Sequence, residues 1–310
     1  MKRIYFIGEC MLELKAKDES TMAQSFAGDV YNSAVYLKRA FPQILSGMVT
    51  VIGQNTISHR MSQRFLQEQL NTDFVFEHET KSPGVYLIET DAQGERTFTF
   101  WRNDSAARQL MQFFDDGMVN QLSTADMVFF SGVALAVIVP ESRELFWQRI
   151  TQLKQAGVTV VFDPNFRASL WPDKKLAKQQ FEQAILLADW VLPGVEDFTA
   201  LYGIESAQQV MDFCTTRGAQ EVVVKNGPAS VLTYSNGTKT EHSITPVTKV
   251  VDTTSAGDAF NGGYLGARLS GLTLEQAVKI GAVAAGTVIQ YPGAIIPKAI
   301  FDQAMASLTV

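Results

Sequence analysis

Residues 251–264, VDTTSAGDAFNGGY, contain a run of small residues followed by an aspartate, Asp258. Small side chains at 255–257 let backbone N–H groups approach a ligand closely, and the pattern predicts that a helix begins there. The N-terminus of a helix has unpaired N–H donors and the positive end of the dipole, so it favours a phosphate. Asp258 would repel that phosphate unless it is a base that takes a proton from an attacking hydroxyl. The string therefore predicts phosphoryl transfer, with helix capping by Ser255 or Asp258 as the simpler alternative.

Other polar residues lie where predicted strands end or helices begin. Asp29 and Asn32 are three residues apart at the start of a helical pattern, so both can face one ligand. When Asp29 is considered without its neighbours, a role as a helix cap explains it equally well. The segment 163–167, DPNFR, follows a strand-like run and predicts the lip of a crevice, where α/β proteins place ligands. Lys225 ends another such run two residues before Gly227, although a lone lysine at a strand end is usually a solvated charge.

These residues need a sheet to hold them. Short β-branched or aromatic runs alternate with longer helical patterns, which is typical of βαβ units and predicts a mostly parallel sheet with helices on both faces. Strands are predicted at 3–7, 48–53, 127–131, 159–163, 190–193 and 221–225. Helices are predicted near 30–41, 57–70, 141–156, 174–188, 206–217, 256–270 and 273–290.

One segment breaks this alternation. Residues 84–90 and 95–101 are rich in aromatic and β-branched residues and flank a glycine-containing turn, so they predict a β-hairpin. The hairpin is expected to join strands from the region of residues 11–26. Together, residues of about 11–26 and 84–102 would form a small β-lid. No repeat or long linker interrupts the chain, so we expect a single α/β domain over residues 1–310.

The composition is that of a well-buried globular protein, with 46% hydrophobic and 19% charged residues. Lys and Arg number 26 against 32 Asp and Glu, a net charge of −6, which gives no support for nucleic-acid or membrane partners. A few local cations must therefore bind any acidic substrate. The longest apolar stretch, 128–139, is shorter than the ~20 residues of a membrane span.

The remaining signals predict a cytoplasmic protein. The basic start and its apolar run meet Glu9 too soon for a signal peptide. Cys10 and Cys214 match no metal spacing and are expected to be buried free thiols. The histidines likewise show no ligand spacing; they are His59, His78 and His242.

The string at 251–264 closely resembles the C-terminal signature of ribokinase-like (PfkB) carbohydrate kinases, and the resemblance covers essentially the whole chain. It implies the ribokinase-like three-layer α/β fold, with a mostly parallel central sheet and a small β-lid. It also implies that Asp258 is the catalytic base and contacts the sugar. The anion hole for the phosphate falls to Ser255, Ala256 and Gly257, with Ser255 in place of the usual first glycine.

Two further elements are similar to those of the family. Residues 26–34 are similar to its Gly-Gly-x-x-x-Asn-x-Ala element, which holds sugar hydroxyls, although Ala27 replaces the first glycine. Glu9 and Glu13 could also face the sugar. The implied sugar ligands of this region are Gly28, Asp29 and Asn32.

The same resemblance implies ATP and Mg²⁺ as cofactors and leaves a monovalent cation open. The implied ATP contacts are Asn165, Lys225 and Gly227, with the anion-hole residues. The family's Asn-x-x-Glu element, which places magnesium through water, falls at 194–197. Its asparagine is absent, so Glu196 or Asp197 must supply the acid.

Two arginines distinguish among sugars. A neutral sugar needs no cation, whereas a planar guanidinium can bind a carboxylate through two hydrogen bonds. Arg102 and Arg167, with Tyr86, match residues of the family branch that phosphorylates 2-keto-3-deoxygluconate, although Phe100 stands where relatives often carry tyrosine. The resemblance therefore implies ATP-dependent phosphorylation of this sugar acid to its 6-phosphate. The expected partners are the sugar acid and ATP, with a homo-oligomer left open.

Three other functions fit part of the sequence. A fructokinase of the same fold shares the Asp-Pro-Asn-x-Arg pattern, so Arg102 is the residue that separates the two. A dinucleotide-dependent dehydrogenase needs Gly-x-Gly-x-x-Gly after the first strand, which Gly8-Glu9-Cys10 does not provide. A catalytically silent sugar sensor is disfavoured by the intact Asp258.

Overall fold

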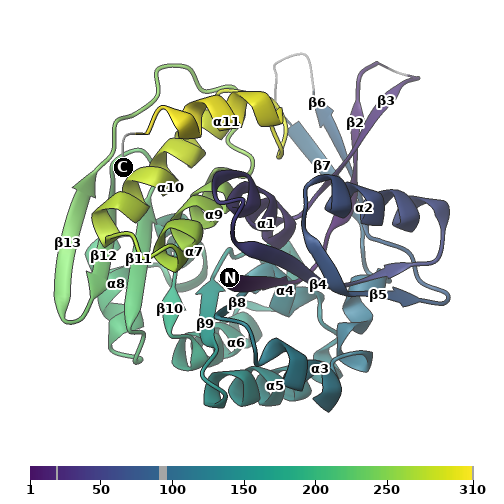
Figure 1. Ribbon diagram of the computed structural model, residues 1–310, viewed down its shortest axis with the longest axis horizontal. Helices are drawn as coiled ribbons and strands as arrows, with labels where there is room; N and C mark the ends of the chain where they lie inside the picture. Colours follow the sequence, from purple (N-terminus) through teal and green to yellow (C-terminus); the bar gives the residue numbers. More distant parts are fainter. Residues whose placement is uncertain (19, 91–95, 309–310) are drawn as a thin grey trace.

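The computed structural model describes residues 1–18, 20–90 and 96–308 and shows two sheets (Figure 1). The larger sheet runs in the spatial order β13 (Thr238–Ser243), β12 (Ser230–Ser235), β11 (Glu221–Asn226), β10 (Trp190–Val191), β9 (Thr159–Asp163), β8 (Met127–Ser131), β1 (Arg3–Ile7), β4 (Leu45–Gly53) and β5 (Asn71–His78). The smaller sheet runs β3 (Met22–Ala27), β2 (Met11–Ala16), β6 (Val85–Thr90) and β7 (Arg96–Trp101). In Figure 1 strands β2, β3 and β6 rise above the large sheet at the upper right.

Strands β11 to β5 of the large sheet are parallel, and only β12 and β13 at one edge are antiparallel. Alternate residues of β1 bury their side chains on opposite faces of the sheet, because successive side chains of a strand point to opposite sides. Tyr5 and Ile7 belong to one hydrophobic cluster, while Ile4 and Phe6 belong to another. Each face therefore has its own core.

Helices cover both faces, which makes three layers. One face packs against α1 (Asp29–Ala40), α2 (Thr56–Gln67), α9 (Ala256–Leu269) and α10 (Leu274–Val288). The other lies under α3 (Asp116–Leu122), α4 (Gly132–Val137), α5 (Arg143–Gln155), α6 (Lys174–Leu187), α7 (Val195–Tyr202) and α8 (Ala207–Thr215). Short 3₁₀ turns are η1 (Ala106–Gln112), η2 (Pro140–Ser142) and η3 (Ala168–Leu170).

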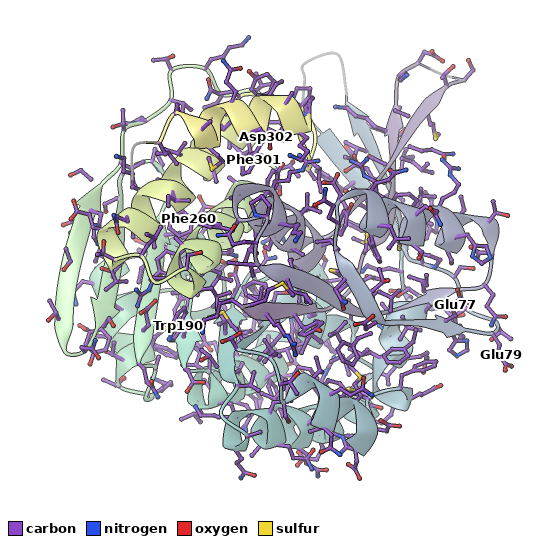
Figure 2. The ribbon with its side chains drawn as sticks, in the orientation of Figure 1. Glu77, Glu79, Trp190, Phe260, Phe301 and Asp302 are labelled. Carbon is purple, nitrogen blue, oxygen red and sulfur yellow. The ribbon has the colours of Figure 1, made fainter. Side chains whose placement is uncertain are left out.

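The last helix, α11 (Lys298–Ala306), extends the first helical layer. Its Phe301 lies against Tyr36 of α1, with ring centroids 4.9 Å apart. Figure 2 shows Phe301 and Phe260 within the layer formed by α9, α10 and α11. This packing fixes the start of α9, where the predicted catalytic string lies.

The small sheet is joined to the body by four short connections. They follow β1, β3, β5 and β7 and reach β2, α1, β6 and η1. Strand β2 pairs with β3 and β6, and β6 pairs with β7 as the predicted hairpin. The predicted turn of that hairpin, 91–94, lies outside the described residues.

Most predicted elements of the large sheet are confirmed, and those at 3–7, 127–131 and 159–163 match residue for residue. The strand predicted at 190–193 ends at Val191, before Pro193, which has no N–H to donate. The hairpin β12–β13 was not predicted. Its turn is Asn236-Gly237, both with positive φ (49° and 78°), which is a strong hairpin signal that the sequence did contain.

Two smaller expectations concern residues outside the catalytic string. Cys10 and Cys214 are both buried free thiols, as predicted. Within residues 1–18, 20–90 and 96–308, none of the helices is both long and apolar enough to cross a membrane.

Candidate active site

Asp258 lies in the first turn of α9, beside the N-terminus of α1. The Nδ2 of Asn32 donates a hydrogen bond of 2.9 Å to Oδ2 of Asp258. The two helices meet closely at Gly262, where an added Cβ would lie only 2.6 Å from the carbonyl oxygen of Ser33. The glycine therefore allows the helix contact that brings a predicted sugar ligand to the predicted base.

The environment of Asp258 raises the pKa of its carboxyl to about 7. Loss of solvent around the carboxyl is the largest cause, and the negative charge of Asp29 is the next. The hydrogen bond from Asn32 acts in the opposite direction, because it stabilises the ionised form. A carboxyl with this pKa can accept a proton and release it again near neutral pH.

Asn165 joins this group from the loop after β9. Its Nδ2 donates to Oδ2 of Asp29 at 2.7 Å, and its backbone has a φ of 32°, which is unusual for a residue other than glycine. The resemblance implied an ATP contact for Asn165. In the structure its side chain contacts Asp29, a predicted sugar ligand, and the ATP contact stays a prediction.

A second network lies at the carboxyl ends of β9 and β11. Asp163 accepts hydrogen bonds from Nζ of Lys225 at 3.0 Å and from Nδ2 of Asn261 at 2.5 Å. Oδ1 of Asn261 accepts from the same lysine at 3.2 Å. Lys225 also lies 3.7 Å from the position of a Cβ added to Gly257, so it borders the start of α9.

Sequence reasoning named Lys225 and Gly257 but missed their neighbours Asp163 and Asn261. Signals for both were present. Asp163 is the first residue of Asp-Pro-Asn, at a strand end, and Asn261 lies three residues after Asp258, on the same side of the helix. Ser255 (φ 65°), directly before α9, and Gly227 (φ 54°), directly after β11, both have a left-handed backbone conformation.

The predicted magnesium element lies at the start of α7. Oδ1 of Asp197 accepts from the backbone N–H of Phe166 at 2.8 Å, and Nη1 of Arg167 lies 3.7 Å away. Burial and the charge of Asp163 raise the pKa of Asp197 to about 6. Glu196 is exposed. Arg167, with 58% of its side chain exposed, borders Asp197.

Direct metal coordination does not fit these residues. Across the described part of the chain, no group of three or more His, Cys, Asp and Glu side chains is arranged to hold a metal ion. Burial first, and then the charge of Asp163, raise the pKa of Asp197, and a further cation nearby would favour its ionised form. A magnesium ion held through water therefore fits this place, and a ring of direct protein ligands does not.

The small sheet contributes a different set of residues. The hydroxyl of Tyr86 donates to Oε2 of Glu13, while the hydroxyl of Ser25 donates to Oε1 at 2.6 Å. Burial and the charge of Glu13 raise the pKa of Tyr86. Arg102, immediately after β7, is 7% exposed and forms an ion pair with the buried Glu9. Arg102 is therefore not a surface charge of the small sheet.

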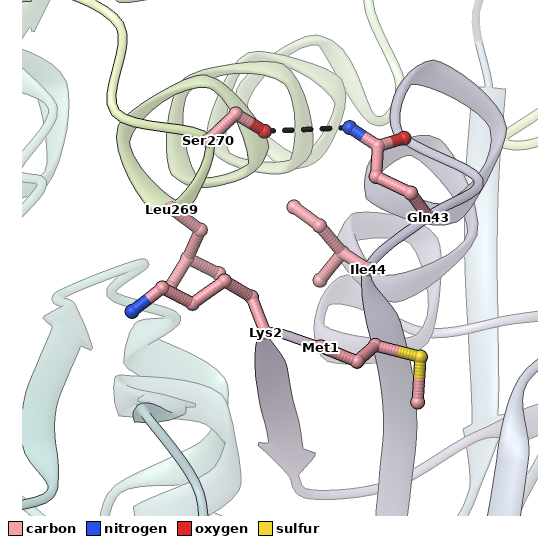
Figure 3. Close-up of a pocket in the computed structure, with 6 residues that line it drawn as sticks. All are labelled: Met1, Lys2, Gln43, Ile44, Leu269 and Ser270. Atoms are coloured by element: carbon pink, nitrogen blue, oxygen red, sulfur yellow. Dashed lines mark hydrogen bonds between the residues drawn. The ribbon is translucent and has the colours of Figure 1, made fainter.

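A surface depression of about 420 Å³ lies elsewhere (Figure 3). It includes the residues before β1, so it lies at the amino ends of the parallel strands, whereas Asp163 and Lys225 lie at their carboxyl ends. Ligands of open α/β sheets bind at the carboxyl ends. Its lining residues are Met1, Lys2, Gln43, Ile44, Leu269 and Ser270.

Curated relatives include a 2-dehydro-3-deoxygluconokinase and a fructokinase. The 2-dehydro-3-deoxygluconokinase of Escherichia coli K12 is 37% identical over 303 residues, covering 96% of this chain and 98% of the relative. The fructokinase of Salmonella typhimurium is 27% identical over 264 residues, covering 85% and 83%. The name 2-dehydro-3-deoxygluconate is a synonym of 2-keto-3-deoxygluconate.

Solved structures match the fold over nearly the full length. A PfkB protein from Polaromonas sp. has a TM-score of 0.85 at 25% identity, covering 98% of this chain and 99% of its own. A putative ribokinase II of E. coli, in complex with ATP and Mg²⁺, has a TM-score of 0.84 at 18% identity, covering 99% of each chain. These likenesses confirm the ribokinase-like α/β fold. The family model for pfkB family carbohydrate kinases matches residues 1–300, and the chain therefore belongs to this family.

Proposed function

We propose that the protein phosphorylates 2-keto-3-deoxygluconate on its terminal hydroxyl, with ATP as phosphoryl donor and the 6-phosphate and ADP as products. The observation that carries the reaction is Asp258, in the first turn of α9, with a pKa of about 7 and a hydrogen bond from Asn32. The substrate follows from the similarity to 2-dehydro-3-deoxygluconokinases and from the buried Arg102. Because ATP is an intracellular substrate, we propose the cytoplasm as the place of reaction.

Asp258 is the general base of this reaction. Its carboxylate accepts the proton of the sugar hydroxyl while the hydroxyl oxygen forms a bond to the γ-phosphorus of ATP. The bond between that phosphorus and the β,γ-bridging oxygen breaks, and its electron pair leaves with ADP. Asn32 fixes the orientation of the carboxylate, while burial and, after it, the charge of Asp29 raise its proton affinity enough for the task.

The start of α9 and the end of β11 form the phosphate side. The helix N-terminus at Ser255, Ala256 and Gly257 favours negative charge on the phosphoryl group as it is transferred. Lys225 adds a cation beside Gly257. Magnesium supplies further neutralisation of the phosphates, and Asp197 with Glu196 would hold it through water. Asp163 keeps Lys225 in place by an ion pair of 3.0 Å.

The N-terminus of α1 and the small sheet form the sugar side. Gly28, Asp29 and Asn32 present hydrogen-bonding groups at one helix turn, and Asn165 orients Asp29. Arg102, directly after β7, supplies the cation for the carboxylate of the sugar acid, and Tyr86 lies on β6, which pairs with β7. The small sheet acts as a lid whose closure excludes water, so that ATP is not hydrolysed in place of the sugar.

A fructokinase is the second candidate, favoured by the shared fold and by the Asp-Pro-Asn-x-Arg segment. Buried Arg102 argues against it, because Nε of the guanidinium, which Glu9 does not contact, would gain no anion from a neutral sugar. An ATP-dependent assay across neutral sugars and 2-keto sugar acids decides between them. We expect 2-keto-3-deoxygluconate to be preferred, and a preference for fructose would reject the proposal. Replacing potassium by tetramethylammonium in the same assay tests dependence on a monovalent cation.

A further inference from the structure

Among the described residues, two Arg–Glu ion pairs have both side chains buried, and they differ in completeness. Arg39 and Glu68 form a pair with two parallel hydrogen bonds, Nε to Oε2 at 2.8 Å and Nη2 to Oε1 at 2.7 Å. Nη1 of Arg39 also donates to the carbonyl oxygen of Ile296 at 2.7 Å. The guanidinium of Arg39 thus uses all three of its nitrogens, as expected for a pair that only stabilises the fold.

The pair of Arg102 and Glu9 is half made, in the sense that one of the two parallel hydrogen bonds seen between Arg39 and Glu68 is missing. Nη2 of Arg102 donates to Oε2 of Glu9. Nε of Arg102 and Oε1 of Glu9 are both buried, and neither has a hydrogen-bond partner within the described residues. The two side chains are only 7% and 2% exposed, so water does not readily replace the missing partners. Unsatisfied buried polar atoms are costly, and a charged pair that retains two of them needs an explanation in function.

The half-made pair lies where the connections between the two sheets meet. Glu9 belongs to the connection from β1 to β2, and Arg102 to that from β7 to η1. Gly84, just before β6, packs on the pair so closely that an added Cβ would lie 2.7 Å from Oε1 of Glu9. Gly28, just before α1, would place a Cβ 2.4 Å from the carbonyl oxygen of Glu9. Glu9 therefore lies against both the start of α1, which carries the proposed sugar ligands, and the connection that leads into β6.

We propose that Glu9 is a positioning residue for the sugar acid. It holds Arg102 by one terminal nitrogen, so that Nε can take the substrate carboxylate when the connections move on binding. In the cyclic form of a 2-keto sugar acid, one carbon carries both a carboxylate and a hydroxyl. Such a unit supplies an acceptor for Nε of Arg102 and a donor for Oε1 of Glu9, which are the two groups that lack partners. The identity of this ligand rests on the proposed function.

Loss of the charge on Glu9 should weaken binding of the sugar acid through Arg102. A buried guanidinium without its carboxylate turns toward other acceptors, so its orientation is lost even though its charge remains. Glu9→Gln keeps the shape of the side chain. We expect it to raise KM for 2-keto-3-deoxygluconate by about 10- to 100-fold and to change kcat by less than about threefold.

A double-mutant cycle with Arg102→Ala tests whether Glu9 acts through Arg102. In the Arg102→Ala background, Glu9→Gln should change KM by less than about twofold, because the arginine that it orients is gone and the glutamine oxygen can still accept from the sugar hydroxyl. The matched control is Glu68→Gln, which breaks the complete pair away from the crevice. It should lower the melting temperature about as much as Glu9→Gln does, yet leave KM within about twofold of wild type.

Two results overturn the inference. One is an unchanged KM in Glu9→Gln, which would make Glu9 as purely structural as Glu68. The other is effects of Glu9→Gln and Arg102→Ala that multiply, which would mean that the two residues act independently. Calorimetric titration of wild type with the sugar acid tests the proposed function separately. If wild type does not bind it, the cycle is run with the sugar that is phosphorylated, and an unchanged KM there rejects the role of Glu9 as well.

Discussion

The two sides of the proposed active site differ in how completely their charged groups are bonded, although the neutral Oγ of Ser255 on the body side also lacks a partner among the described residues. On the body side, Asp163 accepts from Lys225, from Asn261 and from a backbone amide, and Asp258 is held by Asn32. On the side of the small sheet, the Glu9–Arg102 pair leaves two buried polar atoms without partners in the described residues. The groups proposed for chemistry are thus fixed before substrate arrives, whereas the group proposed for selection is completed by it.

This contrast also separates the two parts by their place in the fold. The body residues lie at the ends of parallel strands and at helix starts, which the cores on both faces of the sheet hold rigidly. Arg102 and Glu9 lie in short connections between sheets. A change on the body side should therefore affect every substrate alike, and a change on the other side should affect only substrates that carry a carboxylate.

The largest effect is expected for Asp258→Asn. The amide cannot take the hydroxyl proton, so kcat should fall by ~10²–10⁴ for the sugar acid and for any neutral sugar alike. Circular dichroism and titration with ATP check that the fold and nucleotide binding persist. A loss below tenfold, or a loss confined to one substrate, would mean that the base lies elsewhere.

Arg102→Ala should produce a smaller and selective effect. Losing a charge-assisted contact in a site that is partly wet before closure costs about 2–3 kcal/mol, or roughly 30- to 150-fold in kcat/KM for 2-keto-3-deoxygluconate. Fructose turnover should barely change. Arg149→Ala, which removes an arginine of α5 paired with Asp116 of α3, is the control. Equal losses for both substrates would make Arg102 structural and remove the contrast between the two sides.

The pH dependence tests the body side alone. The base must be ionised, so kcat/KM should rise with pH and level off above the pKa of Asp258, about 7. The negative charge of Asp29 raises that pKa, so Asp29→Asn should move the acid limb of the profile to lower pH even though sugar binding weakens. An acid limb that stays in place would show that Asp29 does not set the proton affinity of the base.

The smallest expected effect is in amide hydrogen exchange. Saturating substrate should slow exchange in β6 and β7 if the small sheet closes over the crevice, whereas β8 and β9 should exchange slowly with or without it. Mass spectrometry of peptides from these strands measures both. Unchanged exchange in β6 and β7 at saturation would count against a lid.

The sequence predicted the elements of the large sheet better than the contacts between them. Strands such as Thr159–Asp163 are continuous apolar runs, and their pattern is local. The contact between Asn32 and Asp258 joins residues 226 positions apart and depends on the close packing at Gly262. Only the resemblance to a family placed these two residues in one site.

Arg102 shows most clearly what a sequence cannot reveal. Its position and charge predicted a cation for a carboxylate, but its partner Glu9 lies 93 residues away and belongs to another connection. No local pattern indicates that the guanidinium is buried, or that its ion pair is incomplete. Asn165 is similar, since its contact with Asp29 follows from how two loops meet and not from either loop alone.

We propose that this kinase acts on a sugar acid because Nε of the buried Arg102 lacks a partner among the described residues, and the substrate carboxylate can provide one. The most direct measurement is kcat/KM of the wild-type protein for 2-keto-3-deoxygluconate and for fructose, with ATP and Mg²⁺ in excess and ADP release as the readout. We predict that the sugar acid is preferred by at least the ~30-fold expected from the Arg102 contact. Equal values, or a preference for fructose, would contradict the account of the substrate.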